Sequence, residues 1–201
     1  MNLPAHQRAE SVPSSVQPSP PKSVGVSVSF NWKRRGAAVP LALPTHLNAA
    51  ARLAKTEFFW PLHATSRAGL YRITITDVDH RWIYIGESEH IQSRLRNYQR
   101  LYPSKPDSTS LRLTVLIRKA LIKEQSVYLD TTSTGKLIIG GSGRPLAMNQ
   151  EAERRFAEAA AVLQEEELAG EDVWVLNKIL DGSGRVMVTS EWDLPEELRR
   201  P

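Results

Sequence analysis

Two tyrosines, an arginine and a third tyrosine follow one another closely enough along this chain to meet in one place. Tyr71 and Tyr84 are separated by 13 residues. That spacing suits a hairpin with strands of about five to seven residues, which brings two side chains together when they share a face. Arg94 and Tyr98 share one side of the helix that follows, where a guanidinium can hold a phosphate through paired hydrogen bonds. The alternative is structural, with tyrosines that bridge core and solvent beside a surface arginine.

The hairpin that would position these residues is readable from its pattern of side chains. Apolar and polar residues alternate over residues 69–76, residues 82–86 form the returning strand, and DVDHR between them supplies turn chemistry. Gly86 ends the second strand, where the backbone must turn closely into the helix. Ser88 is the expected N-cap of this helix, with Glu89 in its first turn.

The region before the hairpin divides into a tail and an extension. Residues 1–24 are rich in Pro, Ser and Gln, and we expect a disordered tail. Residues 25–66 form the predicted N-terminal extension, a strand that ends in the basic segment WKRRG and a helix that begins near Pro44 with Thr45 as its cap. One face of this helix would carry Leu47, Ala51, Leu53 and Ala54. The basic segment either grips a phosphate backbone or is only a turn.

We expect residues 67–201 to form one domain that ends in a C-terminal hairpin. The pattern predicts a helix over 109–125, strands over 126–130 and 135–140, and a long helix over 149–168. The apolar stripe of the long helix would consist of Ala152, Phe156, Ala159 and Leu163.

Composition limits the class of protein. Apolar residues make up 41% of the 201 residues, enough for a packed core. No apolar run approaches the ~18 to 20 residues of a membrane span, and no signal peptide is recognisable. Cysteine is absent, which excludes disulfides, a thiol nucleophile and a cysteine-built zinc site, and fits a cytoplasmic location.

Charge is distributed unevenly along the chain. The net charge is +5 over residues 1–60, +5 over residues 61–125 and −6 over residues 126–201. The basic part includes the predicted hairpin. A basic face of this kind either binds the phosphate backbone of a nucleic acid or is simply a solvated surface.

The tripeptides Gly69-Leu70-Tyr71 and Tyr84-Ile85-Gly86, followed by Arg94, resemble the paired signature of the GIY-YIG nuclease family. Leucine replaces the usual isoleucine in the first tripeptide, the second matches fully, and the resemblance covers residues 69–177. It implies an α/β (α+β) domain with a small central antiparallel sheet of three strands flanked by helices. It also implies metal-dependent cleavage of DNA, with Mg²⁺ or Mn²⁺ as cofactor, DNA as partner, and neither a membrane nor another small-molecule cofactor.

The resemblance assigns roles residue by residue. Tyr71 matches the tyrosine that activates or hydrogen-bonds the attacking water, and Tyr84 matches the second tyrosine, which supports that network and the phosphate. A phenol with a pKa near 10 is a poor base unless a positive charge such as Arg94 or a metal lowers it. Arg94 matches the arginine that neutralises charge growing on the phosphate oxygens. Tyr98 stands where some members have histidine.

The metal ligand is expected on the long helix, as a glutamate followed four positions later by an aliphatic residue. Glu158 with Val162 fits this spacing, and Glu153 is the rival, with Phe156 three positions on. Asn177 either matches an asparagine that often orders the site or is a turn residue at a strand end. The residues expected to order the site are Gly69, Gly86, Tyr98 and Asn177. The basic residues expected to contact DNA are Arg96, Arg100, Arg112, Lys119 and Lys123.

Two functions follow from these patterns. The first is a DNA endonuclease whose site consists of Tyr71, Tyr84, Arg94 and Glu158. The second is a non-catalytic nucleic-acid-binding protein that retains the fold. The presence of candidates at all four positions favours the nuclease.

Overall fold

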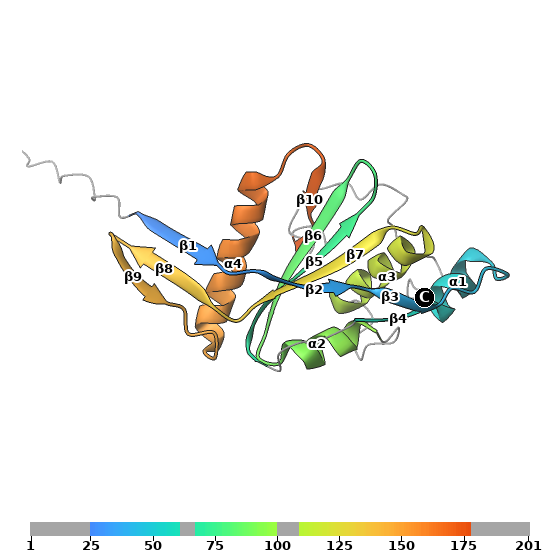
Figure 1. The fold of residues 1–201 in the computed structure, drawn as a ribbon, viewed down its shortest axis with the longest axis horizontal. Helices are drawn as coiled ribbons and strands as arrows, with labels where there is room; N and C mark the ends of the chain where they lie inside the picture. The colour runs from blue at the N-terminus through green and yellow to red at the C-terminus, as the bar shows by residue number, and fades with distance from the viewer. Residues whose placement is uncertain (1–24, 61–66, 100–108, 178–201) are drawn as a thin grey trace, which may run out of the picture.

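A computed structural model describes residues 25–60, 67–99 and 109–177, which form a mixed α/β fold with four helices and three β-sheets (Figure 1). The helices are α1 (Ala49–Lys55), α2 (Ile91–Tyr98), α3 (Thr109–Ile122) and α4 (Glu151–Leu168). None of these four helices is long and apolar enough to cross a membrane.

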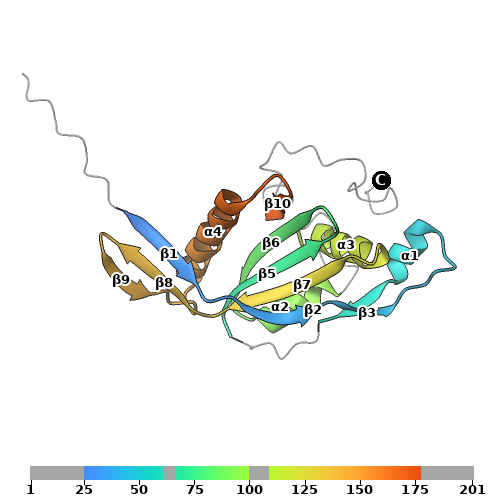
Figure 2. The same cartoon turned by 45° about the horizontal axis from the view of Figure 1, so that its top comes forward.

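The main sheet has five strands in the order β10-β6-β5-β7-β2 (Figure 2), where the family resemblance implies three. Its strands are β2 (Lys33–Ala37), β5 (Gly69–Thr76), β6 (Arg81–Ser88), β7 (Ser126–Thr132) and β10 (Val173–Val175). The predicted hairpin is confirmed as β5 and β6, and these two strands with β7 form an antiparallel centre. β10 adds parallel to β6 and β2 adds antiparallel to β7, so segments distant in sequence supply both edges.

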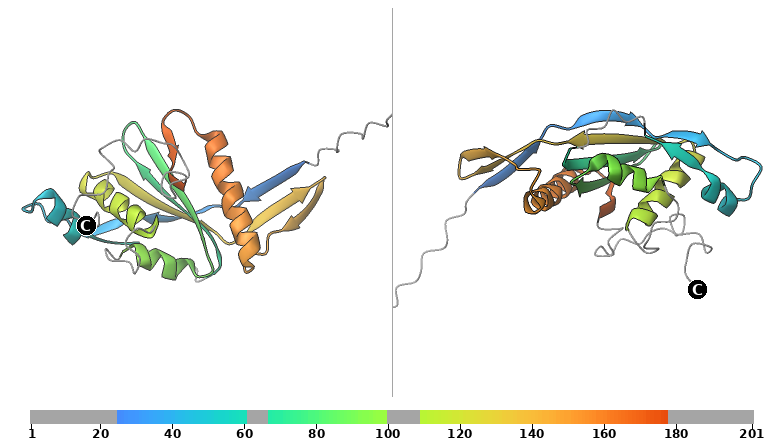
Figure 3. Two further views of the ribbon diagram at one scale, coloured as in Figure 1. Left: turned by 180° about the vertical axis from the view of Figure 1, so that it is seen from behind. Right: turned by 90° about the horizontal axis from the view of Figure 1, so that it is seen from below.

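The sheet is covered on both faces because its central strands are apolar on both. Tyr71, Ile73 and Ile75 of β5 belong to the core that α2 and α3 complete. Leu70 belongs to the core on the opposite face, together with Ala157 of α4. Figure 3 shows α2 and α3 grouped on one side of the central strands and α4 on the other. A helix on each face therefore reaches the hairpin that carries the two signature tripeptides.

Two smaller sheets lie at the ends of the molecule (Figure 1). One contains β1 (Val26–Phe30), β8 (Gly135–Ile139) and β9 (Ser142–Pro145), and packs beside α4. The other contains β3 (Val39–Ala42) and β4 (Glu57–Phe59), next to α1. The strands predicted over 126–130 and 135–140 are confirmed as β7 and β8, and they belong to different sheets.

The N-terminal extension differs from its prediction in two places. The basic segment WKRRG is not a turn, because its last residues form β2 and pair with β7. The helix is short and begins at Ala49, since Asn48 rather than Thr45 caps it by accepting a hydrogen bond from the Ala51 backbone N–H at 2.9 Å. Of the apolar residues predicted to form its buried face, Leu53 alone is buried.

The helix after the hairpin begins later than predicted. Ser88 and its hydroxyl belong to the end of β6, where the Ser88 Oγ accepts a hydrogen bond from the His90 backbone N–H at 3.0 Å. His90, not Ser88, occupies the N-cap position of α2, and Glu89 therefore lies before the helix. Gly86 lies inside β6 and does not end it.

The long helix is confirmed as α4, but its predicted buried stripe is wrong. Phe156 and Leu163 are 42% and 58% exposed, whereas Arg154, Ala157 and Ala161 are buried. The two alanines allow the helix to approach the sheet closely, so the larger apolar side chains turn outward. The predicted tail over 1–24, the second strand of the C-terminal hairpin and Arg100 lie outside the described residues.

Candidate active site

Three tyrosines form a buried cluster on the α2 face of the main sheet. The register of β5 and β6 sets Tyr71 opposite Gly86 and Ile73 opposite Tyr84, so the two tyrosines share a face, with ring centroids 6.2 Å apart. The Tyr98 ring, on α2, lies 6.0 Å from that of Tyr71, and the two hydroxyl oxygens are 2.6 Å apart. The exposed fractions of Tyr71, Tyr84 and Tyr98 are 1%, 6% and 0%. Tyr98, whose role the sequence left open, is thus a member of this cluster.

Close approach explains both signature glycines. A Cβ atom on Gly86 would lie 2.2 Å from the Tyr71 hydroxyl, because the Tyr71 ring crosses the backbone at this position. A Cβ atom on Gly69 would lie 2.1 Å from the carbonyl oxygen of Thr132 on β7. Each glycine is therefore required by a neighbour across the sheet, and Gly86 is not required by a turn into the helix.

Arg94 joins the cluster from the first turn of α2. Its Nε donates a hydrogen bond to the Tyr71 hydroxyl at 3.4 Å, and its Cζ lies 5.4 Å from the centroid of the Tyr98 ring. Burial opposes the charge of the guanidinium, but the neighbouring Tyr71 and Tyr98 raise the pKa of Arg94, so it remains a cation. The half-buried guanidinium places a fixed positive charge at the edge of the phenol cluster.

The phenols of this cluster are neutral. Burial raises the pKa of Tyr71 well above its usual value, and the neighbouring phenols raise it further. Burial also raises the pKa of Tyr84 and of Tyr98, and Tyr98 contacts Tyr84 through its hydroxyl. Arg94 acts in the opposite direction at all three, but burial is the larger effect. Arg94 alone therefore does not bring the pKa of Tyr71 below its usual value, and the phenols serve as hydrogen-bonding groups.

Glu158 lies on the inner side of α4, within electrostatic range of this cluster. Burial and, to a lesser extent, the negative charge of Glu87 on β6 raise its pKa from 4.5 to about 7, although Arg94 and Arg155 act to lower it. The Glu158 charge in turn raises the pKa of Tyr84. Among the described residues, Glu158 has no hydrogen bond or ion pair. Glu158, on the α4 face of the sheet, thus lies within electrostatic range of Tyr84 and of Arg94.

The rival glutamate, Glu153, is occupied elsewhere. Its carboxylate pairs with the Arg144 guanidinium at 2.9 Å and accepts a hydrogen bond from the Ala147 backbone N–H at 2.7 Å. These contacts lower the pKa of Glu153, Arg144 having the larger effect. Glu153 fastens the start of α4 to β9 and the segment that follows it, and is not part of the cluster.

An ion pair that the sequence analysis did not find lies beside Glu158. Arg154, only 5% exposed, donates from Nε to the Glu87 carboxylate at 2.7 Å and from Nη1 to the Met148 carbonyl oxygen at 3.1 Å. Arg154 and Glu158 are four positions apart, one turn of the helix. Glu87 directly follows the second signature tripeptide, and this position is the sequence signal for a second acidic side chain at the site.

Asn177 follows β10 and holds the middle of the second signature tripeptide. Its Oδ1 accepts from the Ile85 backbone N–H at 2.9 Å, and its Nδ2 donates to the Ile85 carbonyl oxygen at 2.6 Å. The Asn177 side chain thus takes the place of a further backbone partner for β6, just beyond the last residue of β10. Asn177 therefore holds the backbone between Tyr84 and Gly86 in place, a contact that suits a site-ordering residue.

The predicted DNA-contacting residues are spread more widely. Arg96 is exposed on α2, two positions after Arg94. Arg112 and Lys119 are partly buried on α3, which packs against α1, α2 and β7, and Lys123 is exposed just beyond its end. These α3 side chains already interact within the protein, so the structure does not gather the predicted set into one patch.

Glu158 fits a divalent cation by the chemistry of its surroundings. It is a partly buried carboxylate with a second carboxylate, Glu87, within electrostatic range, and neither Arg94 nor Arg155 bonds to it in the described part of the chain. Mg²⁺ tolerates a single protein carboxylate because water and phosphate oxygens complete its shell. No group of three or more acidic or histidine side chains in the described residues is placed to hold a metal ion, so Glu158, with Glu87 as a second carboxylate, would hold the ion.

Comparisons with models of protein families, with curated proteins and with solved structures found no match for this chain.

Proposed function

We propose that this protein is a metal-dependent endonuclease that hydrolyses DNA phosphodiester bonds with a site of the GIY-YIG type. The proposal is supported by one observation: a cationic guanidinium contacts a pair of bonded phenols and has an unpaired carboxylate within electrostatic range. These are Arg94, the hydroxyls of Tyr71 and Tyr98, and Glu158. Phosphoryl chemistry needs positive charge near the phosphate oxygens and a group that handles the proton of the attacking water.

Arg94 is the group that favours the transition state. In hydrolysis a water oxygen bonds to phosphorus, the bond from phosphorus to one deoxyribose oxygen breaks, and that oxygen takes up a proton. Negative charge on the phosphate oxygens grows on the way, and a guanidinium already fixed by the Tyr71 hydroxyl stabilises it without reorganising. Such a contact contributes roughly 10² to 10³ in rate.

The phenols orient groups and do not remove protons. Tyr71 accepts a hydrogen bond from Arg94 and exchanges one with Tyr98, so it fixes the direction of the guanidinium. Tyr84 is the most exposed phenol of the cluster and is the one that reaches a bound phosphate. Its raised pKa keeps the proton on the hydroxyl, which then donates to a phosphate oxygen.

Glu158 is the acidic group of the site. A bound Mg²⁺ or Mn²⁺ would supply further positive charge at the phosphate. Without a metal, a carboxyl with a pKa of about 7 exchanges protons near neutrality, which suits a group that accepts a proton from water. Both uses require the carboxylate to be free of internal partners, as it is among the described residues.

Nicking of supercoiled plasmid DNA by the full chain, with Mg²⁺ and with EDTA, tests this proposal. We expect nicking that depends on the metal. Arg94→Ala and Glu158→Gln should each reduce it by about 10²-fold or more. Glu153→Gln is the matched control on the same helix and should retain activity, because Glu153 is bound to Arg144.

One observation favours the non-catalytic alternative. Tyr71 and Tyr98 are fully buried and bonded to each other, an arrangement that also suits a purely structural role. A chain that binds DNA but never nicks it, with any of these metals, would establish that alternative. Nicking that survives both Arg94→Ala and Glu158→Gln would show a different site.

A further inference from the structure

β2 brings three consecutive basic residues to the edge of the main sheet. Lys33 is registered with Thr131 of β7, and Arg34 with Asp130. Successive side chains of a strand point to opposite faces. Lys33 therefore shares the face of Thr131, and Arg34 shares the face of Asp130, on the other side of the sheet.

Lys33 lies in the same cross-strand row as the proposed site. Thr131 is registered with Tyr71, and Tyr71 with Gly86, so the row runs from β2 through β7 and β5 to β6. Adjacent strands are about 4.8 Å apart, which places Lys33 about 10 Å from Tyr71 between their Cα atoms. Thr131 is the short side chain between them.

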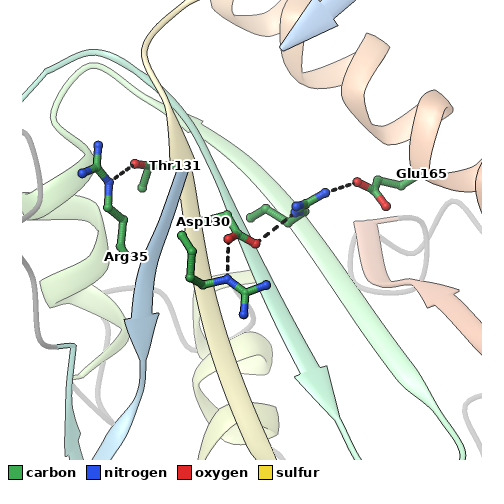
Figure 4. Close-up of polar contacts among 6 residues, drawn as sticks. Arg35, Asp130, Thr131 and Glu165 are labelled. Carbon is green, nitrogen blue, oxygen red and sulfur yellow. Dashed lines mark hydrogen bonds and ion pairs between the residues drawn. The ribbon is translucent and has the colours of Figure 1, made fainter. Parts of the chain in front are cut away.

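Arg35 is directed toward the same row. A register shift between Arg34 and Gly36 leaves Arg35 at an irregularity of the strand. Its Nε donates a hydrogen bond to the Thr131 Oγ1 at 2.8 Å (Figure 4). Arg94 is held in the same way, from Nε to the Tyr71 hydroxyl. Each of the two guanidiniums is thus held through Nε by the hydroxyl of a residue in this row.

The terminal amino groups of Arg35 remain available. Within the described residues, the Thr131 contact is the one hydrogen bond that the Arg35 guanidinium makes. A guanidinium held through Nε keeps both amino groups for a bidentate contact to phosphate. The fixed direction also reduces the entropy that would be lost on binding.

Arg34 is the contrasting neighbour. Its Nε pairs with the buried Asp130 carboxylate at 2.6 Å, and its Cζ lies 4.5 Å from the centroid of the Tyr128 ring. Asp130 also pairs with Arg72, which continues to Glu165 of α4 (Figure 4). The charge of Arg34 is therefore neutralised within the fold, on the face away from Tyr71.

We propose that Lys33 and Arg35 form a second phosphate-binding position, which holds the DNA strand next to the phosphate bound at Arg94. This inference rests on the proposed function. The Tyr71 hydroxyl that holds Arg94 lies over Gly86 of β6, three strand spacings from β2. The two positions are therefore about 14 Å apart, roughly four nucleotides of a strand that rises 3.4 Å per nucleotide. The partner is the sugar-phosphate backbone, since a lysine and an arginine that follow a strand edge supply charge and no pattern for reading bases.

The salt dependence of DNA binding tests this position separately from catalysis. The affinity of the full chain for a fluorescein-labelled duplex is measured by anisotropy in EDTA, between about 50 and 200 mM NaCl. Lys33→Gln with Arg35→Gln should make the log–log slope shallower by roughly 0.9, for the one phosphate that the variant no longer neutralises. Arg35→Lys keeps the charge and should retain the slope. Arg34→Gln removes the same charge from the other face and should leave the slope unchanged.

Each result has a distinct meaning. An unchanged slope in the double variant overturns the second phosphate position, and so does an equal effect of Arg34→Gln, which would show a general charge effect. Neither result bears on cleavage, which the Arg94 and Glu158 variants test by nicking. A wild-type chain that binds with the expected slopes but never nicks would retain this position and lose the nuclease proposal. Thermal melting confirms that each variant is folded.

Discussion

Replacing Glu158 by glutamine should stabilise the protein at alkaline pH while removing its proposed activity. The carboxylate is partly buried and has Glu87 within electrostatic range, and these two causes raise its pKa from 4.5 to about 7. Ionisation of Glu158 is therefore less favourable in the folded protein than in the unfolded chain, which lowers the free energy of unfolding once the group is charged. Glutamine keeps nearly the same shape and carries no charge.

The magnitude follows from the shift in pKa. One pKa unit corresponds to about 1.4 kcal/mol, so the shift sets an upper limit of about 3 kcal/mol. Solvent reaches this partly buried group, and we halve the limit to about 1.5 kcal/mol for screening. For a chain of this size, about 1.5 kcal/mol raises the melting temperature by about 4 °C.

The sign depends on pH. Between pH 4.5 and about 7 the folded protein keeps the Glu158 proton while the unfolded chain has released it. The unfolded state then binds fewer protons, so the wild-type free energy of unfolding falls as pH rises through this window. Below pH 4.5 Glu158 is protonated in both states and the wild type has its full stability. Above pH 7 the carboxyl is ionised in the folded protein as well, and the wild type has lost that part of its free energy of unfolding. The advantage of Glu158→Gln should therefore grow through the same window and level off above it.

The assay is urea unfolding of both chains in EDTA at a series of pH values from 4.5 to 8. At each pH the free energy of unfolding of the wild type is subtracted from that of the variant. An effect of the amide itself is the same at every pH, so only the change of this difference with pH reports on the Glu158 charge. Glu153→Gln is the matched control. It should be less stable than the wild type, the opposite sign to Glu158→Gln, because Arg144 lowers the pKa of Glu153 and so stabilises its ionised form in the folded protein. At pH 8, Mg²⁺ should raise the melting temperature of wild type and not of Glu158→Gln. A difference that does not change with pH would refute the assigned environment of Glu158.

Three further outcomes are expected. Gly86→Ala should destabilise by about 1 to 3 kcal/mol in thermal melts, because the new Cβ meets the Tyr71 ring, and Tyr71→Leu in the same chain should restore much of the loss, whereas additive losses would exclude that contact. Asn177→Leu should cost about 1 to 3 kcal/mol in urea unfolding by removing both partners of Ile85, and wild-type stability would show that the pairing is unimportant. Lys119→Gln with Lys123→Gln should flatten the salt dependence of duplex binding if α3 contacts phosphates, and an unchanged slope would remove α3 from the DNA-binding surface.

The parts of the fold that the sequence predicts well are local. The hairpin of β5 and β6 and the helices α3 and α4 were recognisable because each repeats its pattern over many residues. β2 was missed because a run of Lys, Arg and Gly is typical of a turn, and its pairing with β7 joins residues 96 positions apart. No periodicity within the chain reports such a pairing. The pairing of the outer strands with the sheet therefore could not be predicted.

The prediction of which residues of α4 are buried was wrong for a different reason. Hydrophobicity favours Phe156 and Leu163 as the buried residues, but the distance between helix and sheet is set by Ala157 and Ala161. The site residues fared better because short segments carry them. Tyr71, Tyr84 and Arg94 lie together, and Glu158 lies within electrostatic range of Tyr84 and Arg94. The Glu87–Arg154 pair spans 67 positions and was not found. Burial of the phenols, which reverses the expected effect on their pKa, also depends on tertiary packing.

The ion pairs made by the other glutamates of α4 suggest that the Glu158 carboxylate binds a ligand. Glu151, Glu153 and Glu165 each pair with an arginine, respectively Arg155, Arg144 and Arg72. Glu158 is partly buried, lies within range of a further carboxylate and has no such partner among the described residues. An unpaired carboxylate in this setting lowers stability, and a glutamine would not. Because Glu158 lowers stability on a helix whose neighbouring carboxylates are paired, we expect a bound ligand to stabilise its charge. A cation bound together with a phosphate would do so.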